Sequence, residues 1–162
     1  ILNTVPISGT APEFFFGDRQ GEIVWIEFNE LKDAKWYGAF EPGKLIEDKI
    51  KIEETNDELR LLINGNFYRI NKFSKECMTK LTNSDILDFK NFQSNDLFVF
   101  VEQTGISVLD SSNQKSFKEM NWMIDAKILC IDNSEIEILT DRGEGNEKIN
   151  SQLPTLYKRN AG

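Results

Sequence analysis

The sequence predicts an all-β protein built from antiparallel hairpins and meanders. Its apolar runs are short and rich in Val, Ile and Phe, residues that suit a half-buried strand. Pairs of runs flank brief polar turns, as in LFVFVEQTGISVLD at 97–110, where Glu102–Gly105 form the turn. We expect Gly105 to supply the backbone freedom that this reversal needs. With 162 residues, 40% of them hydrophobic, the chain is long enough to bury a core.

Composition divides the chain into three parts. Residues 1–12 contain Thr, Pro, Ser and Gly without periodicity, so we expect a flexible N-terminal arm there. Residues 13–157 carry the apolar runs and are expected to form a single all-β domain. Residues 158–162 are expected to be a frayed tail.

In the first half of the chain, runs and turns predict two hairpins and two single strands. The Asn64-Gly65 pair lies between two β-rich runs and is the strongest hairpin signal, because both residue types tolerate positive φ. A second turn, at 17–21, separates two aromatic-rich runs. The expected elements are a hairpin at 13–28, strands at 36–40 and 49–53, and a hairpin at 58–71.

The second half continues the same pattern. Residues 73–82 are too short a window to distinguish helix from strand. Residues 85–92 fit a strand or one helical turn, since Asn83–Asp85 is a good N-cap, and we favour the strand because its neighbours are strands. The other expected elements are hairpins at 97–110 and 127–140, a strand at 117–125 with Met120, Trp122 and Ile124 alternating, a polar loop at 141–152, and a short closing strand at 153–157.

The hairpins recur along the chain. They begin near Phe14, Leu59, Leu97 and Ile128, and apolar runs end in Asn71, Asp110 and Asp141. This run–turn–run pattern resembles the inner strand pair of β-propeller blades, although the Trp-Asp, Gly-His and double-glycine signatures of known propeller repeats are absent. The resemblance implies a small propeller-like architecture. A sandwich, a barrel or a curved meander is the alternative.

Charge and composition exclude several function classes. The net charge of −8 and pI near 4.7 argue against nucleic-acid binding, which needs a basic stripe. No apolar run approaches the roughly 20 residues of a spanning helix, so we expect a soluble protein without membrane insertion. Histidine is absent, which removes His-based catalysis and His-ligated metals. Carboxylates, Lys, Tyr and Cys remain as possible catalysts, but they form no catalytic motif. We expect no catalytic residues, no metal and no cofactor.

Two smaller features have structural interpretations. Cys130 lies in an apolar run and is interpreted as part of the core, and Cys77 and Cys130 are expected to be free thiols. The loop 141–147 (DRGEGNE) gathers oxygen ligands that calcium favours, but its spacing does not match an EF-hand. We interpret this loop as a solvated hairpin connection.

Two kinds of residue are candidates for a functional site. Carboxylates close in sequence, Glu27 with Glu30 and Asp85 with Asp88, have the chemistry of a glycosidase pair. The aromatic segment at 21–43 is either core or an exposed recognition surface. The candidate binding residues are Trp25, Trp36, Tyr37 and Glu41.

These observations favour a non-enzymatic acidic binding module whose partner is another protein, as in small inhibitors or immunity-like proteins. The alternative is a carbohydrate-binding or carboxylate-dependent glycan-active domain, and the carbohydrate-binding form needs Trp25, Trp36 and Tyr37 exposed. Abundant Asn, Lys and Ile are typical of an AT-rich bacterial gene. The first residue, Ile1, fits either a cytoplasmic protein or an exported one whose leader was removed.

Overall fold

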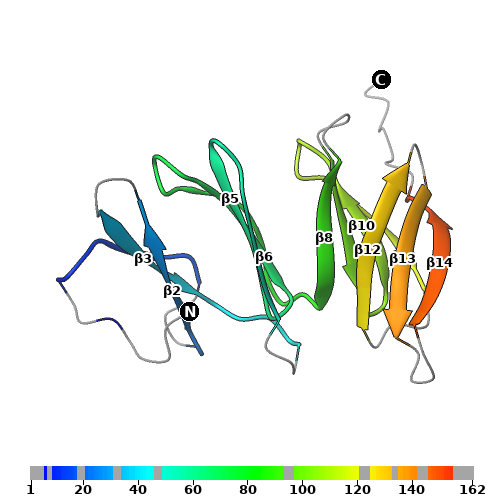
Figure 1. The fold of residues 1–162 in the computed structure, drawn as a ribbon, viewed down its shortest axis with the longest axis horizontal. Helices are drawn as coiled ribbons and strands as arrows, with labels where there is room; N and C mark the ends of the chain where they lie inside the picture. The colour runs from blue at the N-terminus through cyan, green and yellow to red at the C-terminus, as the bar shows by residue number, and fades with distance from the viewer. Residues whose placement is uncertain are drawn as a thin grey trace. The chain divides into compact units, whose positions relative to one another are not determined.

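The structure, a computed structural model, describes residues 6, 9–17, 21–30, 34–45, 49–92, 97–120, 125–132, 135–141 and 146–154. The predicted tail at 158–162 and most of the predicted N-terminal arm lie outside these residues. The described residues form strands and no helix, in four mostly antiparallel sheets of which none closes into a barrel, so the all-β prediction is confirmed. The chain divides into two compact units, Ile1–Ser84 and Asp85–Gly162 (Figure 1).

The first sheet of unit 1 contains β1 (Glu13–Phe15), β2 (Val24–Asn29) and β3 (Lys35–Phe40) in the order β1-β3-β2. The hairpin predicted at 13–28 is wrong, because β1 pairs in parallel with β3. A backbone bond from Phe16 N to Ala39 O extends this pairing, and the Phe16 ring stacks on Phe40 at 4.9 Å. In the parallel register, the Phe16 ring is buried against the Phe40 ring.

The second sheet of unit 1 is an antiparallel meander of β4 (Ile50–Glu54), β5 (Glu58–Ile63), β6 (Asn66–Asn71) and β7 (Cys77–Leu81). Asn64 and Gly65 have φ values of 47° and 102°, as a tight two-residue turn requires, so the predicted hairpin is confirmed. Strand β7 resolves the ambiguous stretch at 73–82.

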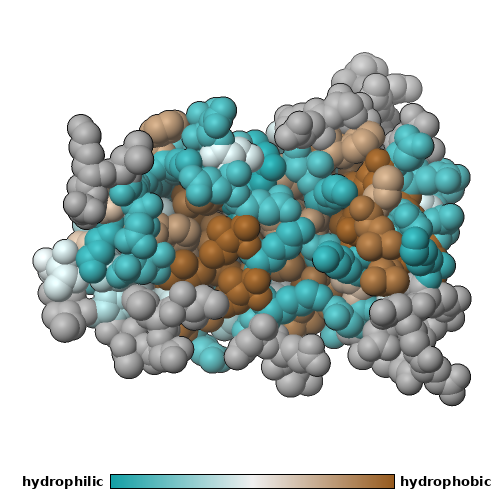
Figure 2. All heavy atoms as spheres, in the orientation of Figure 1, coloured by the Kyte–Doolittle hydropathy of each residue, from teal (hydrophilic) through white to brown (hydrophobic). Residues whose placement is uncertain are grey.

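The two sheets of unit 1 share one hydrophobic core. Alternate residues of β2 and β3 point to the β4–β7 sheet, where they meet alternate residues of β5 and β6. The buried members of this cluster are Phe16, Ile26, Trp36, Phe40, Leu59, Leu61, Ile63, Tyr68 and Ile70. On the face shown in Figure 2, hydrophobic surface gathers over β5 and β6 in this unit and over β12 and β13 in the other.

Unit 2 begins with a second four-stranded meander, β8 (Ile86–Phe92), β9 (Leu97–Glu102), β10 (Gly105–Leu109) and β11 (Lys115–Glu119). The strand at 85–92 and the hairpin at 97–110 are confirmed. The role expected for Gly105 is wrong, since its φ is not positive. A Cβ at this position would lie 2.2 Å from the Lys118 carbonyl oxygen, so glycine permits a close approach of β11.

The last sheet contains β12 (Asp125–Asp132), β13 (Glu135–Asp141) and β14 (Asn146–Gln152), which confirms the hairpin at 127–140. Two predicted boundaries are wrong. Strand β11 ends at Glu119, before the predicted alternation of Met120, Trp122 and Ile124, of which the last two lie outside the described residues. The polar segment expected to be a loop pairs along β13 as β14, whereas Leu153 and Pro154 are not in a strand, and proline lacks the N–H that a ladder uses.

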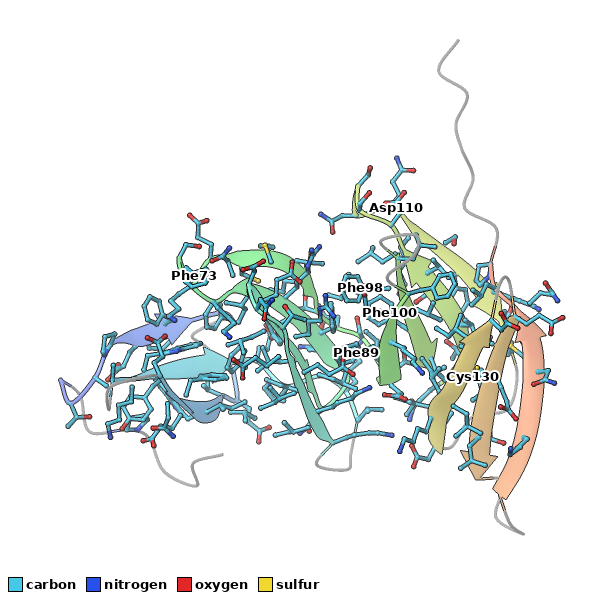
Figure 3. The ribbon with its side chains drawn as sticks, turned by 45° about the horizontal axis from the view of Figure 1, so that its top comes forward. Phe73, Phe89, Phe98, Phe100, Asp110 and Cys130 are labelled. Atoms are coloured by element: carbon cyan, nitrogen blue, oxygen red, sulfur yellow. The ribbon has the colours of Figure 1, made fainter. Side chains whose placement is uncertain are left out.

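Strand β12 packs against β8 within unit 2. The buried Asp88 carboxylate accepts a 2.8 Å hydrogen bond from the Ile128 backbone N–H. The prediction that Cys130 is a core residue is wrong, because a bulge between Ile128 and Cys130 reverses the alternation, leaving Ile128 buried and Cys130 exposed (Figure 3). Cys77 and Cys130 are both free thiols, as predicted.

Candidate functional site

The aromatic residues proposed from the sequence are buried. Trp25, Trp36 and Tyr37 are exposed by only 8%, 3% and 5%. Trp36 stacks on Phe28 at 4.1 Å and belongs to the core between the two sheets of unit 1. Trp25 and Tyr37 form a smaller cluster on the other face of the same sheet. The exposed aromatic platform that carbohydrate binding would need is therefore absent from these three positions.

Glu41 connects two sheets of unit 1 through its backbone. Its carbonyl oxygen accepts hydrogen bonds from the Tyr68 hydroxyl at 2.7 Å and from Asn66 Nδ2 at 3.1 Å. Its carboxylate lies 3.4 Å from Lys80 Nζ. Burial raises the pKa of Tyr68 to about 12, so this hydroxyl stays protonated and keeps donating. The geometry gives Glu41 a structural role in joining β3 to β6 and β7.

Three carboxylates of the two proposed pairs, Glu27, Glu30 and Asp88, have structural partners. A hydrogen bond from Tyr37, together with Lys35, lowers the pKa of Glu27, and Glu30 forms an ion pair with Lys75. Asp88 is buried and bonded to β12, as described above. In the part of the chain that the structure describes, no three acidic or thiol side chains group as metal ligands. The loop interior at 142–145 lies outside that part.

The turn between β6 and β7 presents the most exposed large hydrophobic side chain of the described residues. Phe73 is 76% exposed. Its backbone is nevertheless fixed, because Asn71 Oδ1 accepts hydrogen bonds from the N–H groups of Phe73 and Ser74, both at 2.9 Å. Backbone bonds from Lys75 N to Asn71 O and from Asn71 N to Glu76 O close the turn. A rigid turn thus carries an apolar ring into solvent (Figure 3).

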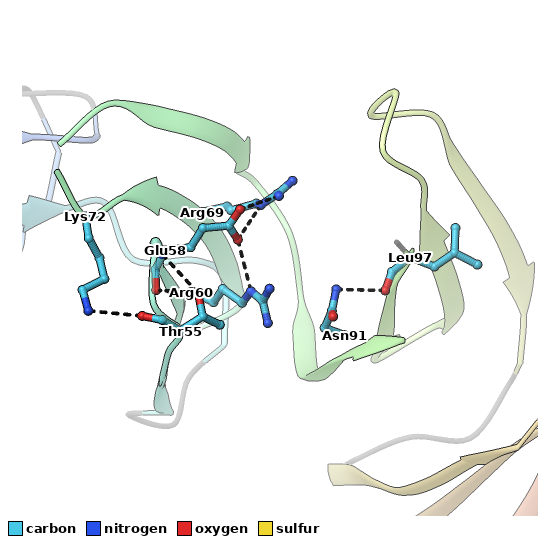
Figure 4. Close-up of polar contacts among 7 residues, drawn as sticks. All are labelled: Thr55, Glu58, Arg60, Arg69, Lys72, Asn91 and Leu97. Atoms are coloured by element: carbon cyan, nitrogen blue, oxygen red, sulfur yellow. Dashed lines mark hydrogen bonds and ion pairs between the residues drawn. The ribbon is translucent and has the colours of Figure 1, made fainter. Parts of the chain in front are cut away.

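Two lysines tie this turn to its surroundings. Lys72 Nζ pairs with Glu54 and donates to the Thr55 carbonyl at 3.1 Å, as Figure 4 shows for Thr55. Lys75, whose side chain is only 13% exposed, pairs with Glu30 and lies 4.8 Å from the centre of the Trp36 ring. It also adopts φ of 60°, which is uncommon for a residue with a side chain. These contacts hold the turn from both sides.

A charged network supports the adjacent loop between β4 and β5. Glu58 accepts two hydrogen bonds from Arg69, at 2.6 and 2.9 Å, and a third at 3.4 Å from Arg60 (Figure 4). The Arg69 hydrogen bonds hold the pKa of Glu58 below its usual range. Thr55 accepts from the Glu58 N–H, and the Asp57 carbonyl accepts from the Lys72 N–H at 2.8 Å. The turn between β6 and β7 is therefore hydrogen-bonded to a loop whose own conformation is fixed.

Other exposed aromatic side chains have partners inside the protein. Phe15 packs edge-on against Trp25 at 5.5 Å. The Phe117 ring covers Gly105, since a Cβ there would lie 2.7 Å from its Cζ atom. No ring contact joins Phe73 to another described residue, and the exposed Cys77 and Met78 follow it within the next five positions. We take the segment Lys72–Met78, called the Phe73 turn below, as the candidate site.

Sequence reasoning did not find this site. The signal was present: Asn71 ends an apolar run, and an aromatic residue two positions later falls in the turn and not in a strand. The alternation rule that assigns aromatic residues to the core applies to strands only. In this chain, an aromatic residue two positions after the strand-ending Asn71 marks an exposed ring.

The fold defines the chain as an all-β protein of open, mostly antiparallel sheets. No helix in the described residues is long and apolar enough to cross a membrane. No known protein family, no curated protein and no solved structure matches the chain significantly.

Proposed function

We propose that this protein is a non-enzymatic binding module that recognises another protein by inserting Phe73 into an apolar pocket. The observation that carries the proposal is a 76% exposed phenylalanine on a backbone fixed by Asn71, Lys72 and Lys75. Burying such a side chain contributes about 1.5–3 kcal/mol. Aromatic anchors of this kind dominate the binding energy of many interfaces.

The rigidity of the turn supports the proposal. Binding costs free energy when a flexible segment has to be ordered, and a preformed turn reduces that cost. The Asn71 side chain, the two backbone closures and the tethered lysines fix the turn before any partner arrives. Occupying a partner's pocket in this way would also block it, which suits the inhibitor-like role suggested by the sequence.

We also infer that the β4–β7 and β8–β11 sheets are two copies of one blade-like unit. Both are four-stranded antiparallel meanders with a two-residue loop between their middle strands. In both, an Asn or Asp at the end of the third strand accepts two backbone N–H bonds from the turn that follows: Asn71 in one sheet and Asp110 in the other. The repeated sheet supplies a common scaffold, and the turns after Asn71 and Asp110 carry different side chains.

Site-specific photo-cross-linking tests the binding function. A photoreactive phenylalanine analogue is placed at position 73 of the full chain, and at position 112 in the equivalent turn of the β8–β11 sheet as a matched control. We expect a discrete cross-linked protein from cell extract at position 73 and none at position 112. With that protein purified, Phe73→Ala should weaken binding by about 30-fold, the value for a hot spot worth about 2 kcal/mol.

The proposal fails if both positions give the same cross-linking pattern. It also fails if the purified partner binds the Phe73→Ala variant as tightly as the original chain. Circular dichroism of the Phe73→Ala variant should be unchanged, because the side chain that is removed contributes little to the core.

A further inference from the structure

We infer that the pocket receiving Phe73 belongs to a protein and is rimmed by lysine or arginine side chains. This inference rests on the proposed function and adds the chemistry of the partner. It comes from the charges that surround the Phe73 turn and from their different degrees of exposure.

The positive charges of the turn face inward. Lys72 and Lys75 are each neutralised by a carboxylate of the same unit, Glu54 and Glu30. The Lys75 side chain is also committed to the Trp36 ring and to the Lys72 carbonyl oxygen. Releasing either lysine toward a partner would break these contacts, so the two ammonium groups are poorly placed to recognise an anion.

The negative charges face outward. The side chains of Glu54 and Glu30 are 63% and 46% exposed, against 27% and 13% for their lysine partners. Glu76, which accepts a hydrogen bond from Ser74 Oγ, and Asp57, whose carbonyl holds Lys72 N, are also exposed. The side chains of Glu30, Glu54 and Glu76 contact groups of the turn, and Asp57 lies on the loop that binds Lys72 N. With Glu58, Arg60 and Arg69 of the adjacent charged network included, five acids stand against four cations, a local charge of −1, and the acids Glu54, Asp57 and Glu76 are exposed.

A complementary partner follows from these charges. Like charges facing each other across an interface disfavour binding, whereas opposite charges accelerate association and select the partner. The net charge of −8 on the whole chain acts in the same direction at long range. A pocket with an apolar floor for Phe73 and a rim of basic side chains fits both features.

A phage library of random disulfide-cyclised peptides tests the inference. The library is selected on the full chain and depleted on the Phe73→Ala variant, which has the same net charge and therefore removes peptides bound by charge alone. We expect the surviving peptides to combine apolar residues with an excess of Lys and Arg over the unselected library. Asp57→Asn and Glu76→Gln should each weaken their binding by about two- to fivefold at low salt.

Glu119→Gln, an exposed acid on β11 in the other unit, is the matched control and should leave binding unchanged. The differences among variants should fade at 1 M salt, where screening extends over about 3 Å. Phe73-dependent peptides without a basic excess, or equal effects of the three acid substitutions, would overturn the inference and leave the proposed function standing. If no peptide distinguishes the original chain from Phe73→Ala, the proposed function itself fails.

Discussion

The two four-stranded sheets, β4–β7 and β8–β11, share a backbone plan and differ in what they present. Their middle strands join through two residues, and Asn71 and Asp110 each accept two backbone N–H bonds in the following turn. One turn carries Phe73 and the other carries Ser112 at a comparable position. Hydrogen bonds to Asn71 or Asp110 thus fix the backbone of each turn, and the identity of the residue at its tip does not affect these bonds.

Gly105 marks one difference between the two sheets. The equivalent first residue of β6 is Asn66, whose side chain donates to the Glu41 carbonyl oxygen. Gly105→Ala would place a Cβ 2.2 Å from a backbone oxygen that cannot move aside, so we expect a loss of about 2–3 kcal/mol of unfolding free energy. Urea denaturation measures it. Gly21→Ala is the control, because nothing lies within 4 Å of its Cβ. Equal midpoints for the two variants would contradict the close approach of β11.

The interaction of Glu58 with Arg69 should make the stability of the β4–β7 sheet depend on pH. The pKa of Glu58 is lowered in the folded protein by the Arg69 hydrogen bonds, so its stabilising effect is present above the unfolded-state pKa and is lost as pH falls through the folded-state pKa. Glu58→Gln should cost about 1–2 kcal/mol at neutral pH. The cost should shrink in acid, where the original carboxyl is protonated. Unfolding curves at neutral and acidic pH measure the change, and a cost independent of pH would exclude the charged interaction.

The shared turn gives a smaller and symmetric effect. Asn71→Ala and Asp110→Ala each remove an oxygen that accepts two backbone N–H bonds, so each should cost about 1 kcal/mol, as for the loss of a helix cap. Asn71→Asp and Asp110→Asn keep the acceptor and should be tolerated. Thermal unfolding compares the four variants. A large cost in only one sheet would show that the two turns are not equivalent.

The fold was predictable from the sequence where one segment decided its own structure. Asn64-Gly65 dictates a turn, and the hairpins at 58–71 and 97–110 follow from local alternation. Prediction failed where the pairing partner, and not the segment's own pattern, decides the structure. Strand β1 pairs with β3 and not with β2, which follows it in the chain, and the polar strand β14 has no apolar alternation of its own but pairs along β13.

The candidate site was harder to predict than the fold. Sequence density of aromatic residues pointed to Trp25, Trp36 and Tyr37, but density does not distinguish a core from a surface. The apolar run around Cys130 predicted a core position for this residue, and a single bulge turned it outward. Exposure depends on register, and a one-residue shift in register reverses it.

The smallest expected effect on stability comes from exchanging the two turn tips. Phe73→Ser and Ser112→Phe, alone or together, should change the unfolding free energy by less than about 0.5 kcal/mol, because both positions are exposed and the Asn71 and Asp110 bonds remain. Binding should respond differently. Phe73→Ser should weaken binding of the partner about as much as Phe73→Ala does, and Ser112→Phe should not restore it, because Glu54, Asp57 and Glu76 contact or adjoin the first turn only. Restoration would mean that any exposed phenylalanine on this scaffold suffices, and the surrounding charges would then have no part in recognition.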